Sequence, residues 1–174
     1  MARPHACVFI ATSVDGFIAR PDGGLDWLGL VAADGEDYGY TAFFTTVDTL
    51  VIGRKTYETA LGFDAWPYVG KRVVVLTHEP ATPQHGETFA AGEPGPLLAR
   101  LHAEGCRRVY VDGGTVIRDF LAAGAIDELT LSVVPILLGA GIRLFDHGHG
   151  EHRLHAAQAR TFPSGLVQLT YRLG

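Results

Sequence analysis

The sequence Leu-Val-Ile-Gly-Arg-Lys-Thr-Tyr at residues 50–57 decides the fold, together with Val-Tyr-Val-Asp-Gly-Gly-Thr-Val at residues 109–116. Each is an apolar run, typical of a buried strand, that stops at glycine and restarts with a helix-like pattern. Glycine lets the backbone approach a ligand, and a helix start offers free N–H groups with a partial positive charge. Two such turns, the first also carrying Arg54 and Lys55, favour a ligand with two or more phosphates. Turns of this kind also occur with a purely structural role, so that alternative stays open.

The two common nucleotide-binding signatures do not fit these turns. A Walker A loop needs glycine at position 48 and lysine after Gly53, where this chain has Asp48 and Arg54. The nearest match to the dinucleotide-binding fingerprint is Gly139-Ala140-Gly141, which has Leu144 where that pattern needs its third glycine. The chain therefore has phosphate-binding turns without either familiar motif.

The composition is typical of a folded protein with a substantial apolar core. The chain has 174 residues, 47% of them hydrophobic, and we expect one domain over residues 1–174. A net charge of −5 argues against a nucleic-acid binder, which usually has a basic face. The N-terminus lacks the apolar core of a signal peptide, and no apolar run is long enough to span a membrane. We therefore expect a cytoplasmic protein with no nucleic-acid or membrane partner.

Strand-like and helix-like patterns alternate through most of the chain. We expect strands at residues 6–12, 50–53, 72–77, 87–90, 108–112 and 128–138, helices at 36–47, 55–61, 96–104 and 115–123, and a hairpin of 153–161 with 167–173. Thr115 is expected to cap the last helix, and Pro135 interrupts the long strand. The pattern predicts an α/β fold in which a mixed, mainly parallel sheet carries helices on both faces and ends in an antiparallel hairpin.

Several segments, taken in order, resemble one known family. They are Ser13–Ala19 (Ser-Val-Asp-Gly-Phe-Ile-Ala), Val51–Glu58, Val73–Thr77, Val111–Gly114 (Val-Asp-Gly-Gly), and Asp127–Leu129 leading into Pro135–Gly139. In these segments the chain is similar to the dihydrofolate-reductase-like proteins, in particular the C-terminal reductase domain of the bifunctional riboflavin-biosynthesis deaminase-reductase. The resemblance covers nearly the whole chain and implies the three-layer dihydrofolate-reductase-like fold.

The resemblance implies NADPH as the cofactor. By position, the residues that would bind it are Gly53, Arg54, Lys55 and Thr56 at the adenosine end, Leu76 and Thr77 at the adenine-ribose groove, Gly113, Gly114, Thr115 and Val116 on the pyrophosphate, and Ala11 and Ile18 beside the nicotinamide. Binding of phosphates by helix starts and a guanidinium agrees with the chemistry of the two glycine turns. The zinc deaminase signature of the bifunctional relatives is missing from the sequence, so we expect no deamination.

Hydride transfer from a nicotinamide requires alignment and one proton from the protein. Dihydrofolate reductases place a carboxylate on the first helix, and Asp37 is the first candidate here, with Asp26 second. A carboxyl group in an apolar cleft is expected to have a raised pKa and to relay the proton. Asp15, in a turn after a strand, is a further candidate, with a turn-capping role as an equally good alternative, and Asp112, before Gly-Gly, is expected to have a structural role.

Three aromatic residues, Trp27, Phe44 and Tyr57, could provide surfaces for a flat substrate, although each could equally be ordinary core. The expected substrate is a flat nitrogen heterocycle, either a pterin related to dihydrofolate or a diaminopyrimidine precursor of riboflavin. A ribosyl-phosphate substrate would need additional basic residues. Once Arg54 and Lys55 are assigned to the cofactor, the remaining basic candidates are Arg20, Lys71 and Arg143. A non-catalytic NADP(H)-binding or regulatory protein is the alternative function.

Neither a metal site nor a nucleophile is expected. His147, His149, His152 and His155 have spacings that could gather imidazoles, but they lie in a glycine-rich connection typical of a solvated loop. Cys7 and Cys106 lack metal-type spacing and a base nearby in the sequence, so both are expected to be structural thiols. The chain also lacks the Gly-x-Ser-x-Gly elbow of the hydrolases.

The long apolar run at residues 128–138 suggests self-association. It offers more strand than a small sheet edge normally leaves exposed, and unprotected edges invite pairing. Riboflavin-type relatives are similar in pairing subunits through this region. We therefore expect a two-fold homodimer built around residues 128–145, with a monomer capped by Pro135 and the histidine loop as the alternative.

Overall fold

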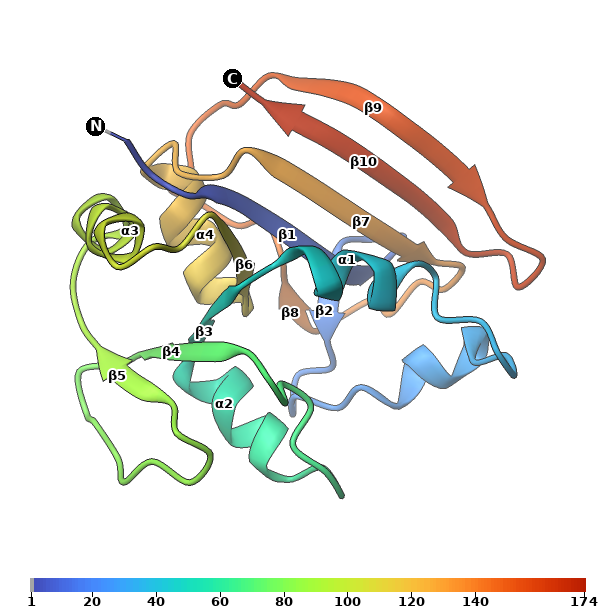
Figure 1. Ribbon diagram of the computed structural model, residues 1–174. Coiled ribbons are helices and arrows are strands. Elements are labelled where there is room, and N and C mark those ends of the chain that lie inside the picture. The colour runs from blue at the N-terminus through green and yellow to red at the C-terminus, as the bar shows by residue number, and fades with distance from the viewer. Residues whose placement is uncertain (1) are drawn as a thin grey trace.

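The computed structural model describes residues 2–174, which are organised around one twisted eight-stranded sheet (Figure 1). The strand order is β5-β4-β3-β6-β1-β7-β10-β9. Its strands are β1 (His5–Ser13), β3 (Thr49–Gly53), β4 (Arg72–Leu76), β5 (Thr88–Ala90), β6 (Arg108–Asp112), β7 (Glu128–Val134), β9 (Leu154–Thr161) and β10 (Val167–Leu173). All pairings from β5 to β7 are parallel, and β10 and β9 add the antiparallel end. A separate two-stranded sheet pairs β2 (Phe17–Ala19) with β8 (Ile142–Arg143).

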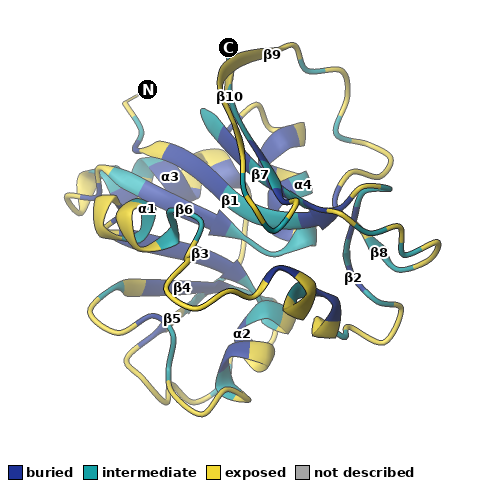
Figure 2. Ribbon diagram, turned by 90° about the vertical axis from the view of Figure 1, so that its right-hand side faces the viewer, coloured by how far each residue is buried: buried dark blue, intermediate teal, exposed yellow. Residues whose placement is uncertain are grey.

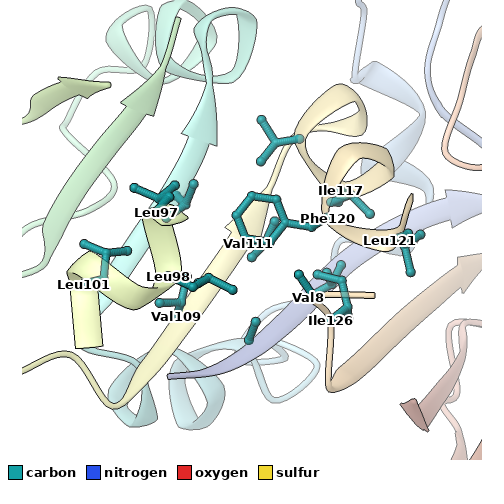
Figure 3. Packing of buried hydrophobic residues seen from close by; sticks show 14 of the residues in the cluster. Val8, Leu97, Leu98, Leu101, Val109, Val111, Ile117, Phe120, Leu121 and Ile126 are labelled. Atoms are coloured by element: carbon teal, nitrogen blue, oxygen red, sulfur yellow. The ribbon is translucent and has the colours of Figure 1, made fainter. Parts of the chain in front are cut away.

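Helices cover both faces of the sheet. On one face lie α3 (Pro94–Ala103) and α4 (Gly114–Ala122), whose leucines, Ile117 and Phe120 pack against Val8, Val109 and Val111 of the central strands (Figure 3). On the other face, α1 (Tyr40–Thr46) and α2 (Arg54–Leu61) contribute Phe43 and Tyr57 to a second core. A short 3-10 helix, η1 (Asp26–Val31), forms a third, smaller core near β7. Burial of these apolar faces provides the main stabilisation of the fold.

The parallel strands are buried along most of their length, as Figure 2 shows for β1, β3 and β6. Strand β1 pairs with β7 from Cys7 to Ser13. Asp127, immediately before β7, accepts hydrogen bonds from both Arg3 guanidinium nitrogens (2.6 and 2.7 Å) and from the Ala6 N–H (2.7 Å). These bonds hold β1 in register against β7, so that the carboxyl ends of the parallel strands come to one edge of the sheet.

The structure corrects several predicted element boundaries. The helix expected at 36–47 begins only at Tyr40, because Gly39 is in the left-handed region (φ 82°) and Asp37 accepts hydrogen bonds from the Gly39 and Thr41 N–H groups. Helix α4 begins at Gly114 after Gly113 (φ 97°), so Thr115 is not its N-cap. Helix α3 starts at Pro94 rather than residue 96. β7 stops at Val134, immediately before Pro135, which has no N–H to donate to the sheet.

The end of the sheet also differs from the sequence expectation. Strand β7 is an interior strand, because β10 covers the side away from β1. The exposed edge is β9, all eight residues of which are exposed to solvent (Figure 2). The argument that residues 128–138 leave an unprotected edge is therefore wrong, although Leu137 beyond β7 remains 70% exposed. Among residues 2–174, no helix has the length and apolar character needed to cross a membrane.

Candidate active site

The two glycine turns lie against each other, as the sequence suggests. Ile52, the last apolar residue before the first turn, is paired with Asp112 before the second. A Cβ atom at Gly113 would lie 2.6 Å from the Thr56 Oγ1 and 3.5 Å from the Gly53 nitrogen, and one at Gly53 would lie 3.2 Å from a Val116 methyl. Only glycine therefore fits at Gly113, where the backbone also has a positive φ.

Two helices begin at this junction, α2 at Arg54 and α4 at Gly114. Neither N-terminus has a side-chain cap within residues 2–174. Their first N–H groups are consequently available to an anion, and the partial positive charge of the helix ends favours one. The sheet ends here too, because Gly53 pairs with Leu76, the last residue of β4. In open α/β sheets, ligands bind in the crevice outside the carboxyl ends of the strands.

The remaining cofactor candidates surround this junction. A Cβ at Gly114 would lie 2.7 Å from Ile18 Cδ1, which places Ile18 over the second turn. The Thr77 N–H donates to the Ala90 carbonyl at the end of β4. Thr115 is exposed, with its hydroxyl 3.4 Å from an Arg118 nitrogen. These three positions agree with the expected groove, but their contact with a cofactor remains a prediction.

The basic pair at the start of α2 is partly engaged. The Arg54 Nε donates to Glu58 at 2.7 Å, and its Nη1 donates to the Glu79 carbonyl at 2.7 Å. Lys55 is exposed to solvent. An exposed ion pair of this kind contributes little to stability, so Arg54 can exchange its partner for a phosphate at small cost.

A cavity of about 210 Å³ lies beside this groove, between β1, β7 and residues 28–38. It is lined by Phe9, Ala11, Leu28, Val31, Ala32, Asp37, Tyr38, Ser132, Val134 and Leu166. Ala11, expected beside the nicotinamide, and Asp37, the first catalytic candidate, therefore face the same space. The aromatic surfaces of the cavity are Phe9 and Tyr38, which sequence reasoning missed. Phe9 belongs to the continuous apolar run at residues 6–12, in which the sequence does not distinguish a residue that faces a cavity from one that faces the core.

The three aromatic residues predicted to bind substrate do not line the cavity. Trp27 is only 2% exposed and packs behind the lining with Val31 and Val134. Tyr57 is also 2% exposed, and its hydroxyl donates to the buried Glu87. Trp27 and Tyr57 are therefore packed as core residues, the alternative that the sequence left open.

Phe44 is half-buried, stacks on Tyr40 with ring centroids 5.6 Å apart, and has Lys71 over its ring at 5.0 Å. It belongs to α1 and does not reach the cavity lining. Among the described residues, there is no group of three or more His, Cys, Asp or Glu side chains that could hold a metal ion.

The carboxylates predicted to relay a proton have lowered rather than raised pKa values. Hydrogen bonds from Thr41, and then from the Gly39 N–H, lower the pKa of Asp37. A hydrogen bond and ion pair with Arg20 (2.7 Å) lower the pKa of Asp26, which is exposed and does not line the cavity. Asp37 is thus an ionised group at neutral pH, and Asp26 does not meet the requirement for a proton donor.

Asp15 has the structural role expected from its turn. It accepts hydrogen bonds from the Ser13 hydroxyl (2.6 Å) and from the Leu138 and Gly139 N–H groups (3.1 and 2.8 Å). Because these donors, with Ser13 contributing most, favour the charged form, the pKa of Asp15 falls to about 2. The carboxylate ties the β1–β2 turn to the segment after β7.

Asp112, for which the sequence suggests a structural role, has the pKa that a proton donor needs. It ends β6 on the same face as Tyr110, at the glycine junction, and burial raises its pKa to about 6. Its one hydrogen bond within the described residues is from the adjacent Gly113 N–H, at 2.8 Å. Burial raises the pKa values of Tyr40 and Tyr68, and the nearby Asp112 charge raises them further. In the sequence, the feature that marks Asp112 is its place at the end of a strand, immediately before Gly113-Gly114.

The sequence matches a known protein family and several of its members. The family model of the RibD C-terminal domain matches residues 4–168. The uncharacterized protein YwjB of Bacillus subtilis is 37% identical over 167 residues, covering 94% of this chain and 95% of YwjB. The riboflavin biosynthesis protein RibD of Corynebacterium ammoniagenes is 28% identical, and the match covers 84% of this chain and 48% of that protein.

Solved structures agree as well. The crystal structure of a putative riboflavin biosynthesis protein from Shewanella sp. PV-4 has a TM-score of 0.92 and 37% identity, covering 98% of this chain and 99% of that one. A Thermotoga maritima diaminohydroxyphosphoribosylaminopyrimidine deaminase/5-amino-6-(5-phosphoribosylamino)uracil reductase shares the fold, with a TM-score of 0.75 at 15% identity, covering 99% of this chain and 57% of that one. The fold is dihydrofolate-reductase-like, and the chain belongs to the RibD C-terminal reductase-domain family.

Proposed function

We propose that this protein is an NADPH-dependent reductase that transfers a hydride to a flat nitrogen heterocycle. The observation that carries the proposal is the contact between the two glycine turns at the carboxyl ends of β3 and β6, next to a cavity that shares Ala11 with the nicotinamide position. Membership of a reductase-domain family supports the same reaction class. The protein acts as a single reductase domain, and we expect it in the cytoplasm.

The residues present fit the cofactor. Because a Cβ at Gly113 would lie 2.6 Å from the Thr56 Oγ1, glycine at this position lets the two turns pack together, which would present the N–H groups of both helix starts to one pyrophosphate. Backbone N–H groups at Gly53–Thr56 and Gly113–Val116 would bind the phosphates, with Arg54 and Lys55 toward the 2′-phosphate. Leu76 and Thr77 would line the adenine-ribose end, and Ala11 and Ile18 would flank the nicotinamide. NADPH, when bound, supplies the hydride.

The protein's own contribution is orientation and one proton. Asp37, ionised, would accept hydrogen bonds from ring or amino N–H groups of the substrate, while Phe9 and Tyr38 hold the ring flat. Asp112, which ends β6 next to β1, has a raised pKa and would hold the proton that the reduced ring takes up. Asp26, Trp27 and Tyr57 have no part in this assignment.

The experiment is turnover of the purified protein. We expect oxidation of NADPH in the presence of at least one compound from a panel of pterins and aminopyrimidines, followed by absorbance. Binding of NADPH with no turnover on the panel would instead favour the alternative, a non-catalytic NADP(H)-binding or regulatory protein of this family.

We also propose a two-fold homodimer built around residues 128–145. The resemblance to riboflavin-type proteins, which pair their subunits through this region, favours the same contact here. Leu137 and Phe145, exposed in this segment, support a contact there. Light scattering at micromolar concentration is expected to give twice the chain mass of 18.7 kDa. A mass of one chain, or a dimer unaffected by Leu137→Asp, would contradict this interface.

A further inference from the structure

The cavity beside the glycine junction has a lining that discriminates by charge. Nine of the ten residues around it carry apolar or small side chains, or a hydroxyl, and Asp37 is the charged one. The Ser132 hydroxyl already accepts a hydrogen bond from the Gln168 amide at 3.0 Å. The Tyr38 hydroxyl donates to the Val31 carbonyl and lies 2.8 Å from the Ser164 hydroxyl. Asp37 is exposed and already accepts hydrogen bonds from the Gly39 and Thr41 N–H groups at 2.9 Å, so it offers a ligand its negative charge and the remaining lone pairs of the carboxylate.

The basic residues that could serve a phosphate are engaged elsewhere. Arg20 is paired with Asp26 at 2.7 Å. The Lys71 Nζ donates to the Val47 carbonyl at 2.6 Å. The Arg143 guanidinium lies 4.7 Å from the Phe17 ring centroid, in the β2–β8 sheet. None of these three residues lines the cavity.

Arg160 of β9 is the basic residue that approaches the same end of the cavity from outside. Its guanidinium lies over the Phe162 ring at 5.1 Å, and Phe162 in turn packs edge-on against Tyr38. Its Nη1 would be 4.0 Å from a Cβ at Gly39. Arg160 thus lies behind Tyr38, where an anionic substrate tail could recruit it.

Charge and size both act against a phosphorylated substrate. Moving a phosphate out of water into an apolar lining carries a large desolvation cost unless a cation compensates it. Asp37 would add repulsion, and like charges within a site are an effective device for excluding a ligand. The cavity of about 210 Å³ is also below the range of about 300–1,000 Å³ typical of sites for drug-sized ligands. A single ring system fits these conditions better than a ring with a sugar phosphate.

We infer that this site takes an unphosphorylated, amino-substituted heteroaromatic ring, with Asp37 at the rim excluding a phosphorylated form. The inference rests on the proposed function, since it takes the cavity as the substrate site. It separates this chain from the activity in the name of the Thermotoga maritima relative, whose compound carries a phosphoribosyl group. Asp37 thereby determines specificity, because its carboxylate attracts the N–H groups of an amino-substituted ring and repels a phosphate.

The test is calorimetric titration of the protein, with and without saturating NADP⁺. The probes are 2,4-diaminopyrimidine, 5-amino-6-(5-phosphoribosylamino)uracil, and the same uracil compound without its phosphate. We expect the phosphorylated compound to bind at least about 10-fold more weakly than its dephosphorylated form. In Asp37→Asn we expect that ratio to shrink, and diaminopyrimidine affinity to fall about 10-fold to 100-fold, the range of hydrogen bonds to charged groups. Asp34→Asn, an exposed neighbour outside the lining, is the matched control and should change neither value more than 2-fold.

Three results would overturn the inference. Tighter binding of the phosphorylated compound would do so, and its loss in Arg160→Gln would identify Arg160 as the phosphate receptor. If Asp37→Asn and Asp34→Asn change the probe affinities equally, Asp37 does not determine the substrate specificity. Failure of all three probes on a protein that binds NADP⁺ would exclude a heterocycle site here while leaving the cofactor site intact. If NADP⁺ itself does not bind, the proposed reductase fails, yet the ranking of the probes is still measured on the cofactor-free protein.

Discussion

Replacing Asp112 by Asn is expected to lower the turnover of NADPH-dependent reduction by about 100-fold to 10,000-fold, the usual contribution of a positioned proton donor. Asn has nearly the same shape but cannot release the proton. The Gly113 N–H donates a hydrogen bond to the Asp112 carboxylate at 2.8 Å. The amide oxygen of Asn can still accept this hydrogen bond, so the turn should keep its conformation. NADPH affinity is therefore expected to change by no more than a few-fold.

The pH profile gives a second readout of the same residue. Burial raises the pKa of Asp112 to about 6, and the proton must be on the carboxyl group before it can be transferred. In the wild-type protein, kcat/KM should therefore fall as the pH rises through about 6, and this dependence should be absent in Asp112→Asn. Asp119→Asn, on the exposed side of α4, is the control and should retain both activity and profile. Full activity of Asp112→Asn would show that another group supplies the proton.

The second large effect is expected at the glycine junction. Gly113→Ala places a methyl group 2.6 Å from the Thr56 hydroxyl on a backbone with φ 97°, so α2 and β6 must separate. We expect a loss of stability of about 1–3 kcal/mol, as for strained backbone positions, and at least a 10-fold loss of NADPH affinity. Thermal unfolding and fluorescence titration measure the two quantities.

Gly105→Ala is the control that separates the effect of backbone strain from the effect of the steric clash with Thr56. Gly105 has nearly the same φ, 94°, but no atom lies within 4 Å of a Cβ placed there. It should lose some stability through the unfavourable φ and keep wild-type NADPH affinity. If Gly113→Ala behaves like Gly105→Ala in both measurements, the close contact of the two turns has no part in cofactor binding.

The fold was predictable because its signals are local. The strand–glycine–helix patterns at 50–57 and 109–116 follow from side-chain period and from the backbone freedom of glycine, and the structure places them as neighbours. The helix expected at 36–47 was overextended, since apolar spacing alone does not reveal the left-handed Gly39 or the Asp37 hydrogen bonds. Such boundaries depend on local hydrogen bonds more than on hydrophobic pattern.

The site was less predictable because its properties arise from tertiary packing. The sequence identifies Asp26, Asp37 and Asp112 as carboxylates, but only the folded environment lowers the pKa of the first two and raises that of the third. The same limit applies to aromatic residues. Trp27 and Tyr57 are buried behind the site. Which aromatic ring faces a cavity is decided by the packing of distant segments.

The central claim is that the two glycine turns, with Arg54 and Lys55, form one NADPH site. Fluorescence titration of NADPH and NADH against the wild-type protein and an Arg54→Ala/Lys55→Ala variant tests it most directly. The account predicts that the wild type binds NADPH at least about 10-fold more tightly than NADH, because a guanidinium and an ammonium recognise the 2′-phosphate. The double variant should bind both nucleotides with similar affinity and keep its fold. No binding of either nucleotide at physiological concentration, or an NADPH preference unchanged in the double variant, would contradict the account.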